Sequence, residues 1–294
     1  VGYSLFARET DYDEINVASF STNTYGASVN WGYPVSEIQR IGFGLGYENL
    51  DLQTGSFASK EIADFVAANG SKFDVFNANV NWVKSTLNRG VFATRGTSQR
   101  LGVDIALPGS GLEYYKMTYS GQHLRKLYRG LTLKLRTDIG YGESYGDTTQ
   151  MPFFKNFYGG GFGSVRGFKR NTLGPQDTPC ADCDGAFFDD PDPIGGNVQI
   201  EFGAEVIFPL PFIKDQRSVQ STFFFDAGNI FNTKCGDDQE ICDSPEFGEL
   251  RYSVGVGATW LSGFGPITFS FAKPFNASES DETEVFQFSL GNQF

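Results

Sequence analysis

The sequence predicts an all-β fold, an antiparallel transmembrane β-barrel of about 12 strands with one long loop folded into the lumen. One observation is that apolar and polar residues alternate with period two in segment after segment, as in strands with one apolar and one polar face. Most segments are about 9–13 residues long, which suits a tilted strand that crosses a bilayer. Short and long connections also alternate, as in outer-membrane barrels. We expect residues 1–294 to form one barrel domain.

The predicted strands are recognised by their apolar faces. In chain order these include positions 41–47, 101–107, 131–141, 198–208, 252–260 and 286–290. Glycine occupies many positions on the polar faces, among them Gly42, Gly44, Gly140 and Gly255. Small residues there suit a curved and crowded barrel interior. A soluble all-β sandwich, with strands of about 5–6 residues, is the alternative that this pattern leaves open.

The connections predict how the chain is oriented. Long ones span positions 10–24, 53–72, 146–196, 232–248 and 274–283, and "KEIADFVAANG" in the second of them predicts a short surface helix. Short ones are "YPVSEI", "LRKLYRG", "PLPFIKDQ" and "LSGFG". "LPGSG" is an exception, a short turn where a long loop is expected. Short turns face the periplasm in such barrels, so we expect both chain ends on that side.

Composition excludes several classes of function. The formal net charge is −12, and no clustered basic face is visible in the sequence, so we expect no nucleic-acid partner. No run approaches 18 consecutive apolar residues, and no secretory signal peptide is recognisable at the start. The single His123 has no Ser or carboxylate placed near it in sequence as a triad or dyad, so we predict that the protein is not an enzyme and needs no cofactor.

Four cysteines lie in two of the long loops. Cys180 and Cys183 are in one, and Cys235 and Cys242 are in the other. At an oxidising surface they predict two disulfides, with local pairing as the first choice and pairing between the loops still open. A metal site at "CADC" is the weaker alternative, and we predict no metal. The acidic runs in these loops suggest solvated surface or cation-bridged contact with anionic lipid headgroups.

Arg166 stands in a glycine-rich stretch, "GGGFGSVRGFKRN", within the longest loop. The alternation of the strands that follow predicts Glu205 and Asp226 on the lumen face. Carboxylates in a restricted lumen need partners, and a loop folded inward could bring a bidentate guanidinium to them. The glycines around Arg166 would allow the close backbone approach that this requires.

The motif "VRGF", which comprises Val165, Arg166, Gly167 and Phe168, is preceded by "FKNFYGGG" and followed by "NTLGP". In this context it resembles the signature of the BamA family, the barrel subunits of the bacterial outer-membrane β-barrel assembly machine. "GLEYYKMTY", "GPITFSFAKPF" and "FQFSLGNQF" extend the resemblance along the chain. It implies that the loop tucks into the barrel and that Arg166 contacts the inner wall at Glu205 and Asp226.

The resemblance also implies a location and a function. The location is the Gram-negative outer membrane. The function is folding and insertion of outer-membrane proteins, by strand templating at a lateral seam and local bilayer thinning. The implied partners are outer-membrane lipids and lipopolysaccharide, unfolded outer-membrane proteins and, through the full-length protein, the BAM lipoproteins. A polypeptide-secretion pore or passive channel of the same superfamily, and an inert barrel scaffold, are the alternative functions.

The C-terminal segment resembles the β-signal that the assembly machinery recognises in its substrates. Its residues are Phe286, Phe288, Leu290, Gly291 and Phe294. An edge strand offers unpaired backbone groups, and alternate apolar side chains set the register of a strand added to it.

Family members carry periplasmic POTRA domains before a barrel of about sixteen strands. This chain resembles the last three-quarters of that barrel, and no POTRA-like segment is recognisable. We therefore expect reduced activity and a smaller closed barrel, in which residues 2–10 pair with residues 284–294, because an open edge in hydrocarbon leaves amides unsatisfied.

Overall fold

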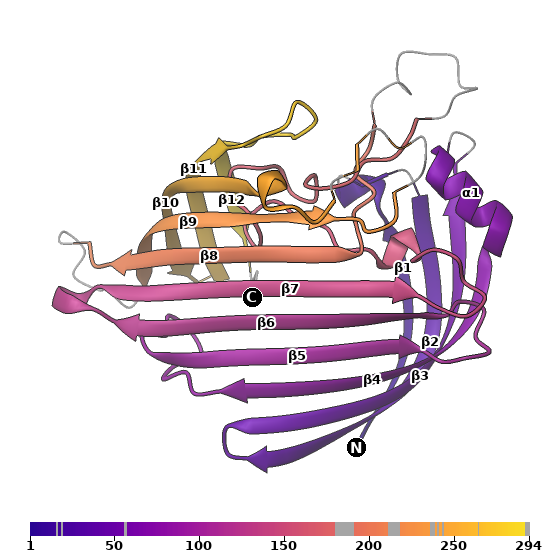
Figure 1. Ribbon diagram of the computed structural model, residues 1–294. Coiled ribbons are helices and arrows are strands. Elements are labelled where there is room, and N and C mark those ends of the chain that lie inside the picture. The colour runs from indigo at the N-terminus through magenta and orange to yellow at the C-terminus, as the bar shows by residue number, and fades with distance from the viewer. Residues whose placement is uncertain are drawn as a thin grey trace.

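The computed structural model describes residues 1–15, 17–18, 20–55, 58–179, 191–210, 218–235, 239, 241–242, 244–263 and 265–291. Within them, twelve strands form one antiparallel sheet in sequence order, β1 to β12 (Figure 1). The predicted fold class is confirmed. The strands are β1 Gly2–Asp11, β2 Phe20–Ser36, β3 Gln39–Thr54, β4 Lys72–Ser85, β5 Gly96–Ala106, β6 Tyr114–Lys126, β7 Thr132–Ser144, β8 Val198–Phe208, β9 Val219–Phe231, β10 Arg251–Ser262, β11 Gly265–Phe275 and β12 Phe286–Leu290.

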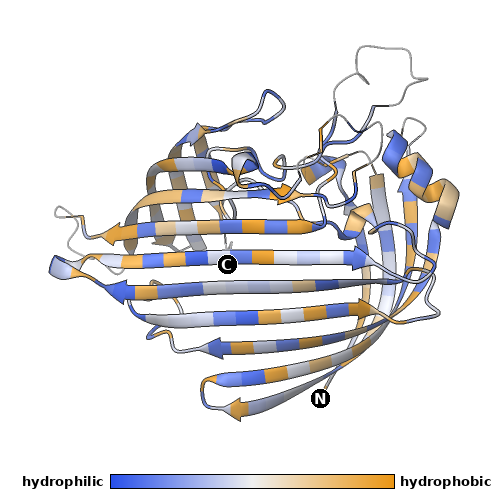
Figure 2. Cartoon of the chain, in the orientation of Figure 1, coloured by the Kyte–Doolittle hydropathy of each residue, from blue (hydrophilic) through white to orange (hydrophobic). Residues whose placement is uncertain are grey.

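The two faces of the sheet differ as the alternation predicts. Large apolar side chains such as Phe43, Leu45 and Val256 are exposed on the outer face. Alternating bands along the strands show the pattern in Figure 2. An outward apolar band is the surface that a transmembrane barrel presents to lipid.

Glycines on the inner face make room for polar side chains of neighbouring strands. Gly44 of β3 lies between Asn30 of β2 and Asn79 of β4. A Cβ atom at Gly44 would overlap the side-chain amides of both asparagines. The glycine-rich polar faces in the sequence therefore reflect a crowded interior.

The connections divide the sheet into two ends. At the short-turn end, tight connections join β2 to β3, β6 to β7 and β10 to β11. At the other end lie helix α1 (Lys60–Asn69) and the long connections, together with the short "LPGSG" turn between β5 and β6 (Figure 1). Four short 3-10 turns, Asp13–Ile15, Tyr128–Gly130, Phe153–Lys155 and Phe247–Glu249, occur in the connections. This asymmetry is the one predicted, and it assigns the short-turn end to the periplasm.

The predicted closure of the sheet is wrong. Among the described residues β1 pairs with β2 alone and β12 with β11 alone, so the sheet has two free edges. Leu5 of β1 is 87% exposed. The physical reason lies in the lumen, where the 146–196 loop contacts both β3 and the β8–β9 wall and holds them apart. A sheet that must enclose this loop cannot curl to the smaller radius that closure with twelve strands requires.

The start of the 146–196 loop is fixed by an aromatic core under α1. Ile62 and Phe65 of the helix are buried, and the Phe65 ring meets the Phe153 ring edge-on at 5.3 Å. Phe154 and Phe73 of β4 complete the contact. Burial of several rings removes a large apolar area from water, so this core holds the loop where it enters the barrel.

The outer part of the loop is tied by Asp177. Its backbone N–H donates to the Asp192 carbonyl at 2.8 Å, and its carboxylate accepts from the Asp192 N–H at 2.8 Å. Burial raises the pKa of Asp177 from its usual 3.8 to about 6. The folded loop therefore favours the protonated carboxyl.

This pKa predicts that the outer loop is held most firmly in acid. Well below pH 4 the Asp177 carboxyl is protonated in both the folded and the unfolded loop. As the pH rises to 6, the unfolded loop releases this proton more readily than the folded loop, so the folded loop loses stability across that window. Hydrogen exchange at the Asp192 amide, corrected for intrinsic rates, should accelerate between these values. Asp177→Asn should abolish this acceleration of exchange, whereas Asp147→Asn, at an exposed site in the same loop, should leave it unchanged. A step that survives in Asp177→Asn would contradict the assignment.

Candidate functional site

Arg166 lies inside the barrel wall and forms the centre of a buried ion-pair cluster. Its Nε donates to Asp226 Oδ2 at 2.6 Å, and its Nη2 donates to Asp226 Oδ1 at 2.9 Å. The same Nη2 donates to Glu205 Oε1 at 3.0 Å. The Asp226 side chain is 0% exposed, so its charge depends on this bidentate partner.

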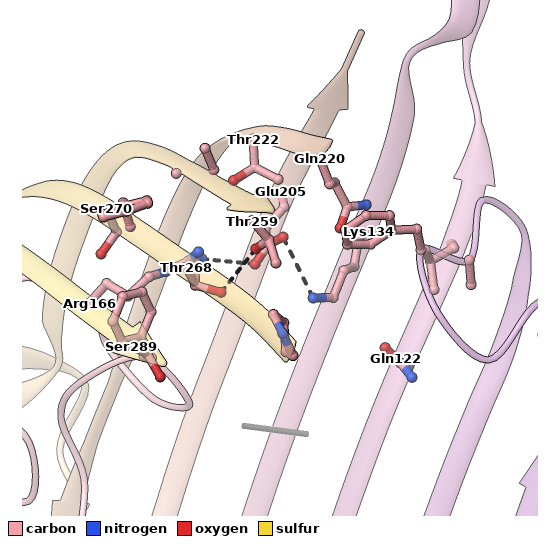
Figure 3. A pocket seen from close by; sticks show the side chains of 18 of the residues that line it. Gln122, Lys134, Arg166, Glu205, Gln220, Thr222, Thr259, Thr268, Ser270 and Ser289 are labelled. Carbon is pink, nitrogen blue, oxygen red and sulfur yellow. Dashed lines mark hydrogen bonds and ion pairs between the residues drawn. The ribbon is translucent and has the colours of Figure 1, made fainter. Parts of the chain in front are cut away.

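The cluster is close to charge balance. Lys134 of β7 approaches Glu205 at 3.6 Å, and Figure 3 shows Lys134 and Arg166 reaching Glu205 from opposite sides. Two cations thus face two carboxylates. The Arg166 guanidinium also stacks over the Phe224 ring, 3.5 Å from its centroid. These contacts compensate for taking the charges out of water.

A polar cavity of about 230 Å³ adjoins Arg166 on the side of the last strands. Inward side chains of β9 to β12, including Thr222, Thr259, Thr268, Ser270 and Ser289, line one side of it, and Gln122 of β6, Lys134 and Glu205 line the other (Figure 3). The cavity leaves room beside the cluster for water or for rearrangement of the loop.

The backbone around Arg166 takes conformations that only glycine adopts readily. Gly160, Gly161 and Gly167 have φ of 102°, 87° and 92°. A Cβ atom at Gly160 would overlap the Lys169 carbonyl oxygen, and one at Gly167 would lie 3.0 Å from the Ala272 Cβ. The glycines therefore fold the loop tightly and let the motif approach β11.

A second arginine, which the sequence analysis did not assign, holds the loop tip. Arg136 of β7 donates to the carbonyl oxygens of Gly163 and Ser164. The Ser164 hydroxyl in turn donates to Glu201 of β8 and accepts from the Gly160 N–H. The available signal was the position of Arg136 on the polar face of a predicted strand, opposite the loop.

The loop is also anchored on the opposite wall. Lys155 lies 3.5 Å from Glu48 of β3. Lys116 of β6 donates to the Lys155 carbonyl at 2.6 Å and stacks on the Phe157 ring. The loop thus bridges the interior from the β3 side to the β8–β9 side.

The VRGF residues touch the last strand and the segment before it. The Gly167 carbonyl accepts from the Glu284 N–H at 2.8 Å, and Phe168 forms a backbone bridge with Thr283. The Gln287 side chain of β12 donates to the Phe168 carbonyl at 2.7 Å. Val165 and Phe168 are fully buried with Leu173 in a small cluster. One side of the motif therefore binds the wall, and the other binds the β12 strand.

The predicted C-terminal residues form an exposed edge. Phe286, Phe288 and Leu290 face outward from β12, and Gly291 follows with φ of 107°. Phe294 lies outside the described residues. Among those that are described, no strand pairs with the far edge of β12.

The remaining predicted residues lie away from this cluster. Cys235 and Cys242 form a disulfide, as local pairing predicts, whereas Cys180 and Cys183 lie outside the described residues. His123 lies within β6, where its Nδ1 and the Thr97 hydroxyl share a 2.8 Å hydrogen bond. In the described part of the chain no three His, Cys, Asp or Glu side chains gather as metal ligands. Nor does any described helix have the length and apolarity to cross a membrane.

A family profile and individual relatives place the chain in the same superfamily. A family profile described as the Omp85 superfamily domain matches residues 1–294. The chain is 34% identical to the outer membrane protein assembly factor BamA of Neisseria meningitidis serogroup B, over 100% of the chain and 39% of that protein. A SAM50-like protein of Drosophila melanogaster is 25% identical over 100% of the chain and 61% of its own length. The chain thus spans less than two-thirds of the length of each of these relatives.

Solved structures agree with the sequence comparison. BamA from Haemophilus ducreyi lacking POTRA domains 1–3 matches with a TM-score of 0.89 and 30% identity, covering 98% of this chain and 57% of that one. CdiB from Acinetobacter baumannii matches with a TM-score of 0.56 and 11% identity, covering 92% of this chain and 42% of that one, which shows a shared fold alone.

Arg166→Ala should release the loop from the wall. It leaves the buried Asp226 carboxylate without its guanidinium, and breaking such a pair costs about 3–5 kcal/mol. We expect faster protease cleavage within residues 146–196 and a lower unfolding temperature. Asp226→Asn should change protease cleavage and the unfolding temperature in the same direction. The control is Lys169→Ala, in the same loop as Arg166, which removes an exposed ion pair with Glu282. It should lower the free energy of unfolding by less than about 1 kcal/mol. Equal protease resistance of Arg166→Ala and the parent protein would refute the pairing.

Two glycine substitutions test the tight fold of the loop. Gly160→Ala should destabilise it by about 1–3 kcal/mol, because φ is positive there and the Cβ meets backbone. Gly163→Ala is the matched control, since nothing lies within 4 Å of a Cβ at that site. Thermal unfolding of the folded protein compares the two, and an equal effect of both substitutions would count against a steric requirement at Gly160.

Proposed function

Because the chain belongs to the Omp85 superfamily, we propose that it forms the strand-pairing part of an outer-membrane β-barrel assembly factor. In this proposal the protein folds and inserts other outer-membrane proteins by offering the free edge of β12 to an incoming strand. Its relatives are named as an outer membrane protein assembly factor, a SAM50-like protein and a subunit of the sorting assembly machinery. Its location is the Gram-negative outer membrane, as for the bacterial relatives.

The free edge of β12 is the observation that carries this proposal. β12 pairs with β11 from Phe286 to Leu290, and its other side has no partner strand in the described part of the chain. Unpaired backbone groups in hydrocarbon cost several kcal/mol each. Pairing of a substrate strand with this edge removes that cost and is therefore strongly favourable in free energy. The outward Phe286, Phe288 and Leu290 would set the register of the added strand.

In this proposal the bilayer is thinned locally beside the edge of β12, which lowers the barrier for an incoming strand.

In this proposal the VRGF loop positions the edge. Arg166 fixes the loop to β8 and β9, and the Phe168 carbonyl then meets Gln287 of β12. The loop thus connects the rigid wall to the strand that accepts substrate. We assign Val165, Arg166, Gly167 and Phe168 as the latch, with Glu205 and Asp226 as its wall partners.

The proposed activity requires no catalytic residue and no cofactor, because strand pairing supplies the free energy and local thinning of the bilayer lowers the barrier. We propose one barrel domain over residues 1–294. Its partners would be unfolded outer-membrane proteins, outer-membrane lipids and lipopolysaccharide, and lipoproteins that bind the full-length assembly factor. The likeness to CdiB, at 11% identity, concerns the fold alone and supports no function.

Photo-crosslinking tests substrate capture at the edge. A benzoylphenylalanine at Phe288 should crosslink to a peptide with the sequence of residues 284–294, since that peptide has the alternating pattern and terminal aromatic of a β-signal. The matched control is the same label at Val256 of β10, which is also exposed on the outer face but lies in a strand paired on both sides. Labelling should be several-fold stronger at Phe288. Equal labelling at both sites would mean non-specific lipid-face contact.

A further inference from the structure

Basic side chains from separate parts of the sequence gather at the short-turn end of the sheet. Lys84 is the last residue but one of β4 and lies on its outer face. Arg95 immediately precedes β5, Arg125 lies near the end of β6, and Arg129 lies in the β6–β7 turn. We call these four residues the basic rim. Register places Arg95 beside the end of β6, because Gly96 of β5 is opposite Leu124 of β6. Lys84 of β4 is opposite Gln99 of β5 and lies further into the sheet on the same face.

The basic rim carries uncompensated positive charge. The chain as a whole is acidic, with 35 Asp and Glu against 23 Lys and Arg. Yet segments 84–100 and 118–132 contain no acidic residue. Arg95, Arg125 and Arg129 are exposed, and the described residues provide no ion pair for any of the four. These cations are therefore open to an anion from outside the chain.

Exposed apolar side chains accompany the rim. Tyr128 is 76% exposed in the β6–β7 turn, next to the exposed Leu127. The Arg129 guanidinium lies 5.1 Å from the centre of the Tyr128 ring. Tyrosine beside lysine and arginine is the composition that anchors proteins at the boundary between hydrocarbon and headgroups.

The backbone of the β6–β7 turn supports display of these side chains. Arg129 has φ of 56°, a left-handed conformation that is uncommon outside glycine, and Gly130 follows with φ of 82°. Positive φ at both central residues is the usual geometry of a tight β-hairpin turn. Here the turn projects Tyr128 and Arg129 away from the sheet.

The rim lies at the level of lipid headgroups. By strand alternation, Lys84 and Arg125 lie on the same outer face as Trp82 and Leu133, which belong to the apolar band. The cations thus border the hydrocarbon on its periplasmic side. We propose that the basic rim binds the phosphate groups of anionic phospholipids in the inner leaflet of the outer membrane.

An acidic protein surface is the other class of partner that positive charge could attract. Lipid is favoured because the charges lie on the lipid-facing side of the strands, immediately below the apolar band, and share the turn with exposed Tyr128 and Leu127. This inference depends on the membrane orientation of the sheet and is independent of strand capture at β12.

Native mass spectrometry of the folded protein from mixed micelles tests the proposal. The probes are phosphatidylglycerol and, as the zwitterionic comparison, phosphatidylethanolamine. The rim variant combines Arg95→Ser, Arg125→Ser and Arg129→Ser. The matched control combines Lys72→Ser, Lys234→Ser and Lys273→Ser, which removes the same charge at the long-loop end.

The rim variant should retain about fivefold less phosphatidylglycerol than the parent protein, with phosphatidylethanolamine unchanged. The control variant should retain both lipids as the parent does. A third variant with Arg→Lys at the same three rim sites keeps the charge, so it should restore phosphatidylglycerol and so separate lipid binding from any loss of folding. Undiminished phosphatidylglycerol in the rim variant, or an equal loss in the control, would overturn the proposal. Retained lipid together with lost binding of polyglutamate would assign the rim to an acidic protein instead.

Discussion

The buried ion-pair cluster of Arg166 with Asp226 and Glu205 is the constraint on which the arrangement of this barrel wall depends. Charges removed from water must be paired. The geometry of these pairs allows the Arg166 guanidinium a single position against the inner face of β8 and β9. That position fixes the backbone on both sides of Arg166. It brings the Ser164 end of the loop to Arg136 and the Phe168 end to Gln287. The site is therefore a connector between a rigid wall and an edge strand.

The loop also determines the shape of the sheet. Its contacts at Lys155 and at Arg166 reach walls that are far apart in strand order, and the aromatic core under α1 holds its entrance. A loop fixed at several points resists compression because protein interiors are closely packed. Open edges are costly in hydrocarbon, so the free edge of β12 has a large potential gain from pairing. Structural rigidity inside the barrel and reactivity at its edge are thus linked.

Charge is distributed very unevenly over this acidic chain. Of the acidic residues that the structure describes, most lie at the long-loop end, such as Asp177, Glu246 and Asp281. The lipid-facing border of the short-turn end is basic at Arg125 and Arg129. Net charge alone therefore gives no account of which surface meets which partner. A basic border below the apolar band would keep the barrel at a fixed depth while the edge near β12 deforms the bilayer.

The sequence by itself determined the strands, their two faces, the alternating connections and the inward direction of Glu205 and Asp226. These follow from period-two alternation, which is a local property of extended backbone. Only the tertiary structure decided that the sheet stays open, that Arg136 and Gln287 join the loop contacts, and that Lys84, Arg95, Arg125 and Arg129 form one basic border. Each of these depends on residues far apart in the chain, whose approach is set by register and by the volume of the loop in the lumen. Local pattern carries no information about either.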